Sequence, residues 1–150
     1  MKRVLLGVAL ICFTGAAAQP GVKIEIIGGT LPDIPAKTRG RMDLTTGEAL
    51  LLRYGKTELR IDYAKVNTIE YGQNVSRRYA AGILISPVLL LSKSRRHFVT
   101  LGYLDGEGKQ QALVVRIDKG DIRAVLASLE ARTGRRVEYQ DKEARKAGKE

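Results

Sequence analysis

With 150 residues, of which 44% are hydrophobic and 28% charged, the chain is long enough for one domain with its own hydrophobic core. One cysteine and one histidine exclude a scaffold held by disulfides and leave few ligands for a metal site. The formal net charge of +10 favours anionic partners, such as lipid head groups, acidic polysaccharides or acidic proteins.

Residues 1–18 have the pattern of a secretory signal peptide. Two basic residues precede an apolar stretch from Val4 to Phe13, and Ala16–Ala18 fit the preference of signal peptidase for small residues. The stretch is too short to span a bilayer as a helix, and Ile11 before Cys12 argues against lipid attachment at that cysteine. We therefore expect cleavage after Ala18.

Removal of these 18 of the 150 residues leaves 132 residues without cysteine and with a net charge of +8, because the removed segment contains two basic and no acidic residues. We expect this protein to be periplasmic or extracellular, which argues against nucleic acid as a partner. It enters an oxidising compartment without a disulfide, so a packed core has to hold it together.

Residues 19–38 are predicted to form an N-terminal strand and a loop. Val22, Ile24 and Ile26 alternate along the chain, which indicates a strand over Val22–Ile27 that ends before the proline-containing loop. Strands over residues 38–45, 49–54 and 57–63 follow, with tight turns between them. In the last of these strands apolar residues alternate with charged ones, which predicts one buried and one solvated face.

The second half of the chain first continues with strands. A turn at Tyr63–Val66 leads into a strand that ends at Tyr71, because β-branched and aromatic residues dominate there. Residues 97–104 and 110–117 form the clearest hairpin of the chain, since an Asp-Gly turn separates two runs of strand-forming residues.

The hydrophobic period then changes from that of a strand to that of a helix. Apolar residues recur at the spacing i, i+3, i+4, i+7, at Ile122, Val125, Leu126 and Leu129. This predicts a helix over about Lys119–Thr133, capped by the side chain of Asp118 or Asp121 and ended by Gly134. A short strand over residues 135–139 follows. Residues 140–150 are mostly charged and are predicted to be a disordered tail.

Six or seven antiparallel strands followed by one helix predict a mainly β protein of the α+β class, with the helix on one face or across one open end of the β layer. Three stretches resemble pleckstrin-homology-like domains of the GRAM or bacterial type: Leu59–Gly72, His97–Ile117 and Asp121–Gly134. The resemblance covers residues 39–139 and implies a bent antiparallel β-sandwich or barrel capped by the helix. It implies no particular ligand, because such domains bind lipids or peptides or act as scaffolds.

An apolar insertion at residues 79–91 departs from the ordinary domain of this type. No acidic residue occurs from Tyr71 to Leu104, and basic residues stand at both ends of the insertion. The residues that we expect to contact a membrane or a partner are Arg77, Arg78, Ile83, Leu84, Ile85, Val88, Leu89, Leu90, Lys93, Arg95 and Arg96.

Three interpretations of this insertion stay open. It could dip into one leaflet, as a hairpin turning at Ser86–Pro87, while the arginines hold head-group phosphates. It is too short to cross a bilayer as a helix, which needs about 20 apolar residues. It could instead be a buried strand pair or short helix of the core, or an apolar patch that contacts a protein partner.

The sequence offers no set of residues for catalysis, for a cofactor or for a metal. His97 stands next to two arginines, which would lower its pKa, and no nucleophile can be assigned to it. The turn Asp105–Gly108 lacks the alternating ligands of a calcium loop. We predict a non-enzymatic exported binding module that engages an anionic membrane surface or an acidic partner. The alternative is a structural or self-associating scaffold whose apolar segment is core or subunit interface.

Overall fold

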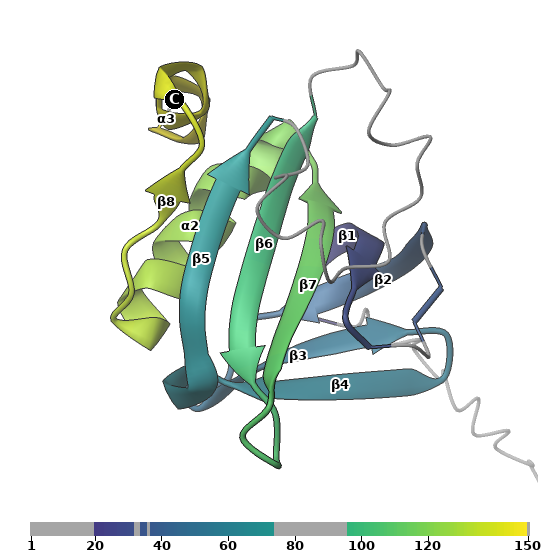
Figure 1. The fold of residues 1–150 in the computed structure, drawn as a ribbon. Coiled ribbons are helices and arrows are strands. Elements are labelled where there is room, and N and C mark those ends of the chain that lie inside the picture. The colour runs from purple at the N-terminus through teal and green to yellow at the C-terminus, as the bar shows by residue number, and fades with distance from the viewer. Residues whose placement is uncertain (1–19, 32–33, 36, 74–95, 150) are drawn as a thin grey trace, which may run out of the picture.

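The computed structural model describes residues 20–31, 34–35, 37–73 and 96–149 (Figure 1). Within these residues eight strands form one sheet. The strands are β1 (Val22–Gly29), β2 (Thr38–Asp43), β3 (Ala49–Tyr54), β4 (Thr57–Asp62), β5 (Val66–Gly72), β6 (His97–Leu104), β7 (Gln110–Ile117) and β8 (Glu138–Tyr139). The helices are the 3-10 turn η1 (Tyr63–Lys65), α2 (Lys119–Thr133) and α3 (Lys142–Lys149).

The strand order in the sheet is β4-β3-β2-β1-β7-β6-β5-β8, so two antiparallel meanders meet where β1 pairs with β7. The register of this pair shifts between Ile26 and Gly28, an irregularity of the kind that increases the local twist of a sheet. Figure 1 shows β2, β3 and β4 running across the direction of β5, β6 and β7, so the sheet is strongly bent. The predicted mainly β architecture with a helix after the strands is confirmed.

The core fills the concave side of the bent sheet, and α2 closes it. The four predicted apolar residues of α2 are each at most 3% exposed and pack with side chains from both meanders. The strand residues of this cluster include Ile24, Ile26, Leu50, Leu52, Ile61, Ile69, Tyr71, Val99, Leu101, Leu113 and Val115. The prediction that the helical stripe covers the β layer is therefore confirmed.

The two ends of α2 differ in how well the sequence predicted them. Gly134 is the C-cap with a left-handed φ of 69°, as expected, and its N–H donates to the carbonyl of Glu130. At the start Asp118 is the N-cap residue, but its side chain makes no capping hydrogen bond. The backbone carbonyl of Asp118 accepts the N–H groups of Asp121 and Ile122 instead, so the predicted side-chain cap is wrong.

Residues 142–149 form α3, where the sequence predicted a disordered tail. The helix packs through small residues, since Ala144 is fully buried and Gly148 lies against Tyr71 and Tyr139. A Cβ atom added at Gly148 would be 2.9 Å from the Tyr139 ring. The absence of large apolar residues from the tail led to the prediction of disorder. Small residues at i and i+4 instead let the helix backbone approach the aromatic rings closely.

Candidate partner-binding surface

Most of the predicted contact residues lie outside the described residues. These are Arg77, Arg78, Ile83, Leu84, Ile85, Val88, Leu89, Leu90, Lys93 and Arg95. The hairpin turn predicted at Ser86–Pro87 lies outside them too. Arg96 is described, is partly buried, and directly precedes β6. The structure therefore places the ends of the predicted contact segment and the surfaces around those ends.

The two ends of the segment meet at one point of the sheet. Gly72 at the end of β5 pairs with Phe98 in β6, and the N–H of Arg96 donates to the carbonyl of Gln73 at 3.4 Å. Residues 74–95 therefore leave and rejoin neighbouring strands.

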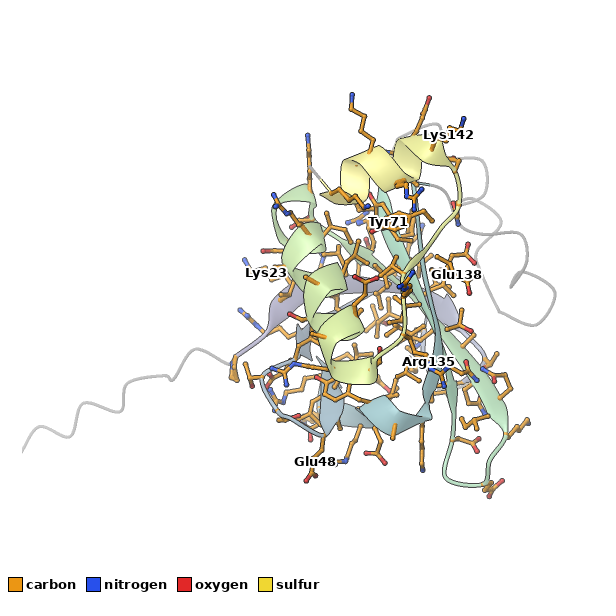
Figure 2. The ribbon with its side chains drawn as sticks, turned by 90° about the vertical axis from the view of Figure 1, so that its left-hand side faces the viewer. Lys23, Glu48, Tyr71, Arg135, Glu138 and Lys142 are labelled. Carbon is orange, nitrogen blue, oxygen red and sulfur yellow. The ribbon has the colours of Figure 1, made fainter. Side chains whose placement is uncertain are left out.

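Helix α3 brings further positive charge to this end of the sheet. Figure 1 shows α3 beside the end of β5 where the chain leaves the sheet, and Figure 2 shows Tyr71 directly below the helix. The exposed basic residues of α3 are Lys142, Arg145, Lys146 and Lys149. Lys119, at the start of α2, is exposed as well. Basic residues that are distant in sequence thus gather around the end of the sheet where Gln73 and Arg96 meet.

An aromatic cluster joins α3 to the ends of β5 and β6. The Tyr71 hydroxyl lies 2.5 Å from Nδ1 of His97, with the two rings nearly parallel, and Tyr139 meets Tyr71 edge-on at 6.0 Å between centroids. Burial raises the pKa of Tyr71 to about 12, so the phenol stays protonated and its O–H donates a hydrogen bond to Nδ1 in the tautomer of His97 that carries its proton on Nε2. Burial, and then the charge of Lys119, lowers the pKa of His97, which favours the neutral ring that can accept this bond.

His97 should make the stability of the fold depend on pH. Because the folded pKa lies below the ordinary value of 6.5, the unfolded chain binds the proton more readily. The contribution of neutral His97 is complete above that value and is lost as the pH falls through the folded pKa. We expect a lower melting temperature at about pH 5 than at about pH 7.5, measured by circular dichroism.

A His97→Gln variant provides the control for this pH effect. His97 is the only histidine of the chain. Hydrogen bonds from Thr45 and Gln111 lower the pKa values of Asp43 and Asp105, respectively, from 3.8. These two carboxyls therefore titrate below the compared range of about pH 5 to about pH 7.5. The difference in melting temperature should shrink in the variant. An unchanged difference would assign the pH dependence to other groups.

The central strands β6 and β7 are buried on both sides. On the side turned away from α2, four apolar residues are at most 6% exposed, although they do not belong to the core cluster. They are Ile27, Phe98, Ala112 and Val114, and we call them the second face. They alternate with core residues along their strands, as expected when successive side chains point to opposite faces of a sheet.

Two buried polar residues accompany the second face. Strand pairing places Glu70, Thr100 and Val114 in one row across β5, β6 and β7. Glu70 is 4% exposed, and its Oε1 accepts a hydrogen bond of 2.9 Å from Nε2 of Gln140. Its Oε2 is buried and has no hydrogen-bond partner among the described residues. A buried carboxylate oxygen without a hydrogen-bond partner lowers the stability of the fold, and a hydrogen-bond donor at this position would remove that cost.

A charged cleft of about 290 Å³ borders the second face where β1, β2 and β7 meet. Register places Arg39, Glu25 and Arg116 side by side, and Arg116 pairs with Phe98 on its other side. Nη2 of Arg116 lies 2.6 Å from Oε2 of Glu25. The two groups form an ion pair, but their geometry is not that of a hydrogen bond. Lys23, labelled in Figure 2, also lines the cleft. The second face therefore has a charged rim.

The described part of the chain offers neither a metal site nor a membrane-spanning helix. No group of three or more His, Cys, Asp or Glu residues there could hold a metal ion. None of the helices in these segments is long and apolar enough to cross a membrane. No protein-family model matches the sequence, and no curated protein is significantly similar to it.

Proposed function

We propose that the chain is an exported, non-enzymatic binding module with a pleckstrin-homology-like fold, which engages an anionic membrane surface or an acidic partner through the segment Arg77–Arg96. The two antiparallel meanders, the bend of the sheet and the helix that closes it support the fold part of the proposal. The absence of acidic residues from Tyr71 to Leu104 supports the preference for an anionic partner.

The observation that carries the proposal is the convergence of basic residues around one end of the sheet. The N–H of Arg96 donates to the carbonyl of Gln73, so the two points where the segment joins the described strands lie together. The exposed basic residues of α3 lie beside the same end. Several cations on one surface add up, since each Lys or Arg near an anionic membrane contributes about 1 kcal/mol.

The test is co-sedimentation of the purified, exported protein with vesicles. We expect binding to vesicles that contain phosphatidylglycerol and little binding to neutral phosphatidylcholine vesicles. Changing both Arg95 and Arg96 to Glu should weaken binding to the anionic vesicles by about tenfold or more, because each substitution removes a favourable charge and adds a repulsive one. Raising the salt concentration should weaken binding of the unchanged protein.

The matched control changes Arg135 and Arg136 to Glu, which makes the same change in net charge. Both residues are exposed, and Figure 2 shows Arg135 at the opposite end of α2 from Tyr71 and Lys142. This variant should keep most of the binding. Equal binding to both kinds of vesicle would argue against a membrane partner. Equal losses in the two variants would mean that net charge, rather than this surface, drives binding.

A further inference from the structure

We propose that the charged cleft between β1, β2 and β7 binds a small acidic zwitterion, whose acidic group lies between Lys23 and Arg39 and whose ammonium group contacts Asp118. Amino acids with an acidic side chain and phosphoethanolamine share this chemistry. The cleft contains no residue of the segment Arg77–Arg96, so this inference is independent of the function proposed above.

Strand pairing brings Lys23 close to both Arg39 and Asp118. In β1, Lys23 lies two residues before Glu25, which pairs with Arg39, so the two cations are diagonal neighbours on one face of the sheet. Diagonal neighbours are about 7–8 Å apart, a distance that two long side chains can bridge through one anion. On the other side of β1, the register with β7 places Asp118 beside Lys23. All of these residues line the cleft.

The three side chains that would contact the ligand are free. Among the residues that the structure describes, none of the three forms an ion pair or a side-chain hydrogen bond. The other arginines of β2, β3 and β7 do have partners, since Arg41, Arg53 and Arg116 each contact a carbonyl or carboxylate oxygen. Two positive charges and one negative charge in the cleft are therefore left for a ligand.

This charge balance defines the class of ligand. Glu25 and Arg116 form an ion pair and neutralise each other. A simple anion would be attracted by the two free cations but repelled by Asp118, and a simple cation would be repelled by both basic side chains. A molecule with a net negative charge that also carries an ammonium group matches all three free groups.

The size and lining of the cleft restrict the ligand further. At about 30 Å³ per water molecule in the liquid, the cleft volume of about 290 Å³ has room for about ten non-hydrogen atoms. Five of the seven lining residues are charged, and an apolar ligand would remove water from these charges without replacing it. Arg39 offers a planar fork of donors that suits a carboxylate or phosphate group, and Lys23 adds a second charge.

Titrations followed by amide chemical shifts in NMR spectra test the site. Glutamate and phosphoethanolamine are added separately to the purified, exported protein at near-neutral pH and constant ionic strength. For at least one of them we expect saturable shifts around the cleft with a Kd of about 1 mM or tighter. The tighter of the two shows whether the acidic group is a carboxylate or a phosphate. Acetate and ethanolamine, which each carry a single charge, should bind at least about tenfold more weakly.

A double variant tests the contacts with the acidic group. Changing Lys23 and Arg39 to Gln should weaken binding of the tighter probe by about tenfold or more, because both contacts are charge-assisted. The two side chains are exposed, so the fold should tolerate these changes. The matched control changes Arg135 and Arg136 to Gln, which alters the net charge equally and lies well away from Lys23 (Figure 2). This control should bind within about twofold of the unchanged protein.

Asp118→Asn tests the ammonium contact separately. Asparagine suits an N-cap position as well as aspartate does, and the Asp118 side chain makes no capping bond, so the start of α2 should be kept. Removing this negative charge should weaken binding of the tighter probe about threefold or more, while acetate binds equally well or more tightly. Tighter binding of both the probe and acetate would overturn the assignment of a zwitterion.

Three further results would overturn the site itself. They are the lack of saturation by either glutamate or phosphoethanolamine up to about 20 mM, shifts confined to residues outside the cleft, and equal losses of binding in the two glutamine variants. Vesicle binding that depends on Arg95 and Arg96 would neither replace nor exclude this site, since neither residue lines the cleft.

Discussion

Replacing Leu129 with alanine is expected to lower the free energy of unfolding by about 3 kcal/mol. Leu129 is fully buried in the cluster where α2 closes the bent sheet. Removing a buried leucine side chain loses its transfer free energy and leaves a cavity, and such substitutions cost about 2–5 kcal/mol. The neighbours come from strands and from the helix itself, so the site cannot collapse by moving one flexible loop.

Urea unfolding followed by circular dichroism measures this effect. The control is Arg123→Ala, an exposed position on the same helix, which should change stability by no more than about 0.5 kcal/mol. A loss below about 1 kcal/mol for Leu129→Ala would mean that α2 does not close the core. The closure of the sheet by its helix, on which the proposed pleckstrin-homology-like fold depends, would then be wrong.

The elements that the sequence predicted well are those whose signals are local. The alternation in β4, the hairpin of β6 and β7, and the stripe of α2 each depend on residues within one stretch of chain. Their bounds in the structure match the expected ones closely. Gly134 ends α2 for an equally local reason, because the left-handed C-cap conformation favours glycine.

The pairing partner of the short strand predicted over residues 135–139 and the helix after it were not predicted, because both depend on contacts between distant residues. The strand β8 is parallel to β5 through Glu70–Glu138 and Tyr71–Tyr139, which are nearly 70 residues apart in the chain. The helix α3 forms because Tyr71 and Tyr139 provide a surface for it. Nothing in residues 140–150 alone contains that information. The gathering of basic side chains around Arg96 follows from this docking and could not be predicted without it.

The second face did leave a signal in the sequence. β7 contains the unbroken apolar run Ala112–Val115, and such runs are typical of strands buried on both sides. A strand with one solvated face would alternate there, as β4 does.

The last prediction concerns Gly40, where two paired strands approach each other closely. This residue lies in β2 opposite Tyr54 of β3, and a Cβ atom added to it would be 2.5 Å from the backbone carbonyl oxygen of Arg53. Backbone atoms of a paired strand cannot rotate away as a side chain can, so the two strands would have to separate. We expect Gly40→Ala to lower the free energy of unfolding by about 2–3 kcal/mol, at the upper end of the usual cost of overpacking.

A second glycine provides a matched control for this substitution. A Cβ atom at Gly120, in the first turn of α2, would meet nothing within 4 Å. Gly120→Ala should therefore be neutral or stabilise the protein by up to about 1 kcal/mol, since alanine restricts the unfolded chain and favours the helix. Because Gly40 adjoins Arg39 in the charged cleft, the position of that cleft depends on the same close approach of β2 and β3. Equal stability of the two alanine variants would mean that β2 and β3 have room for a side chain.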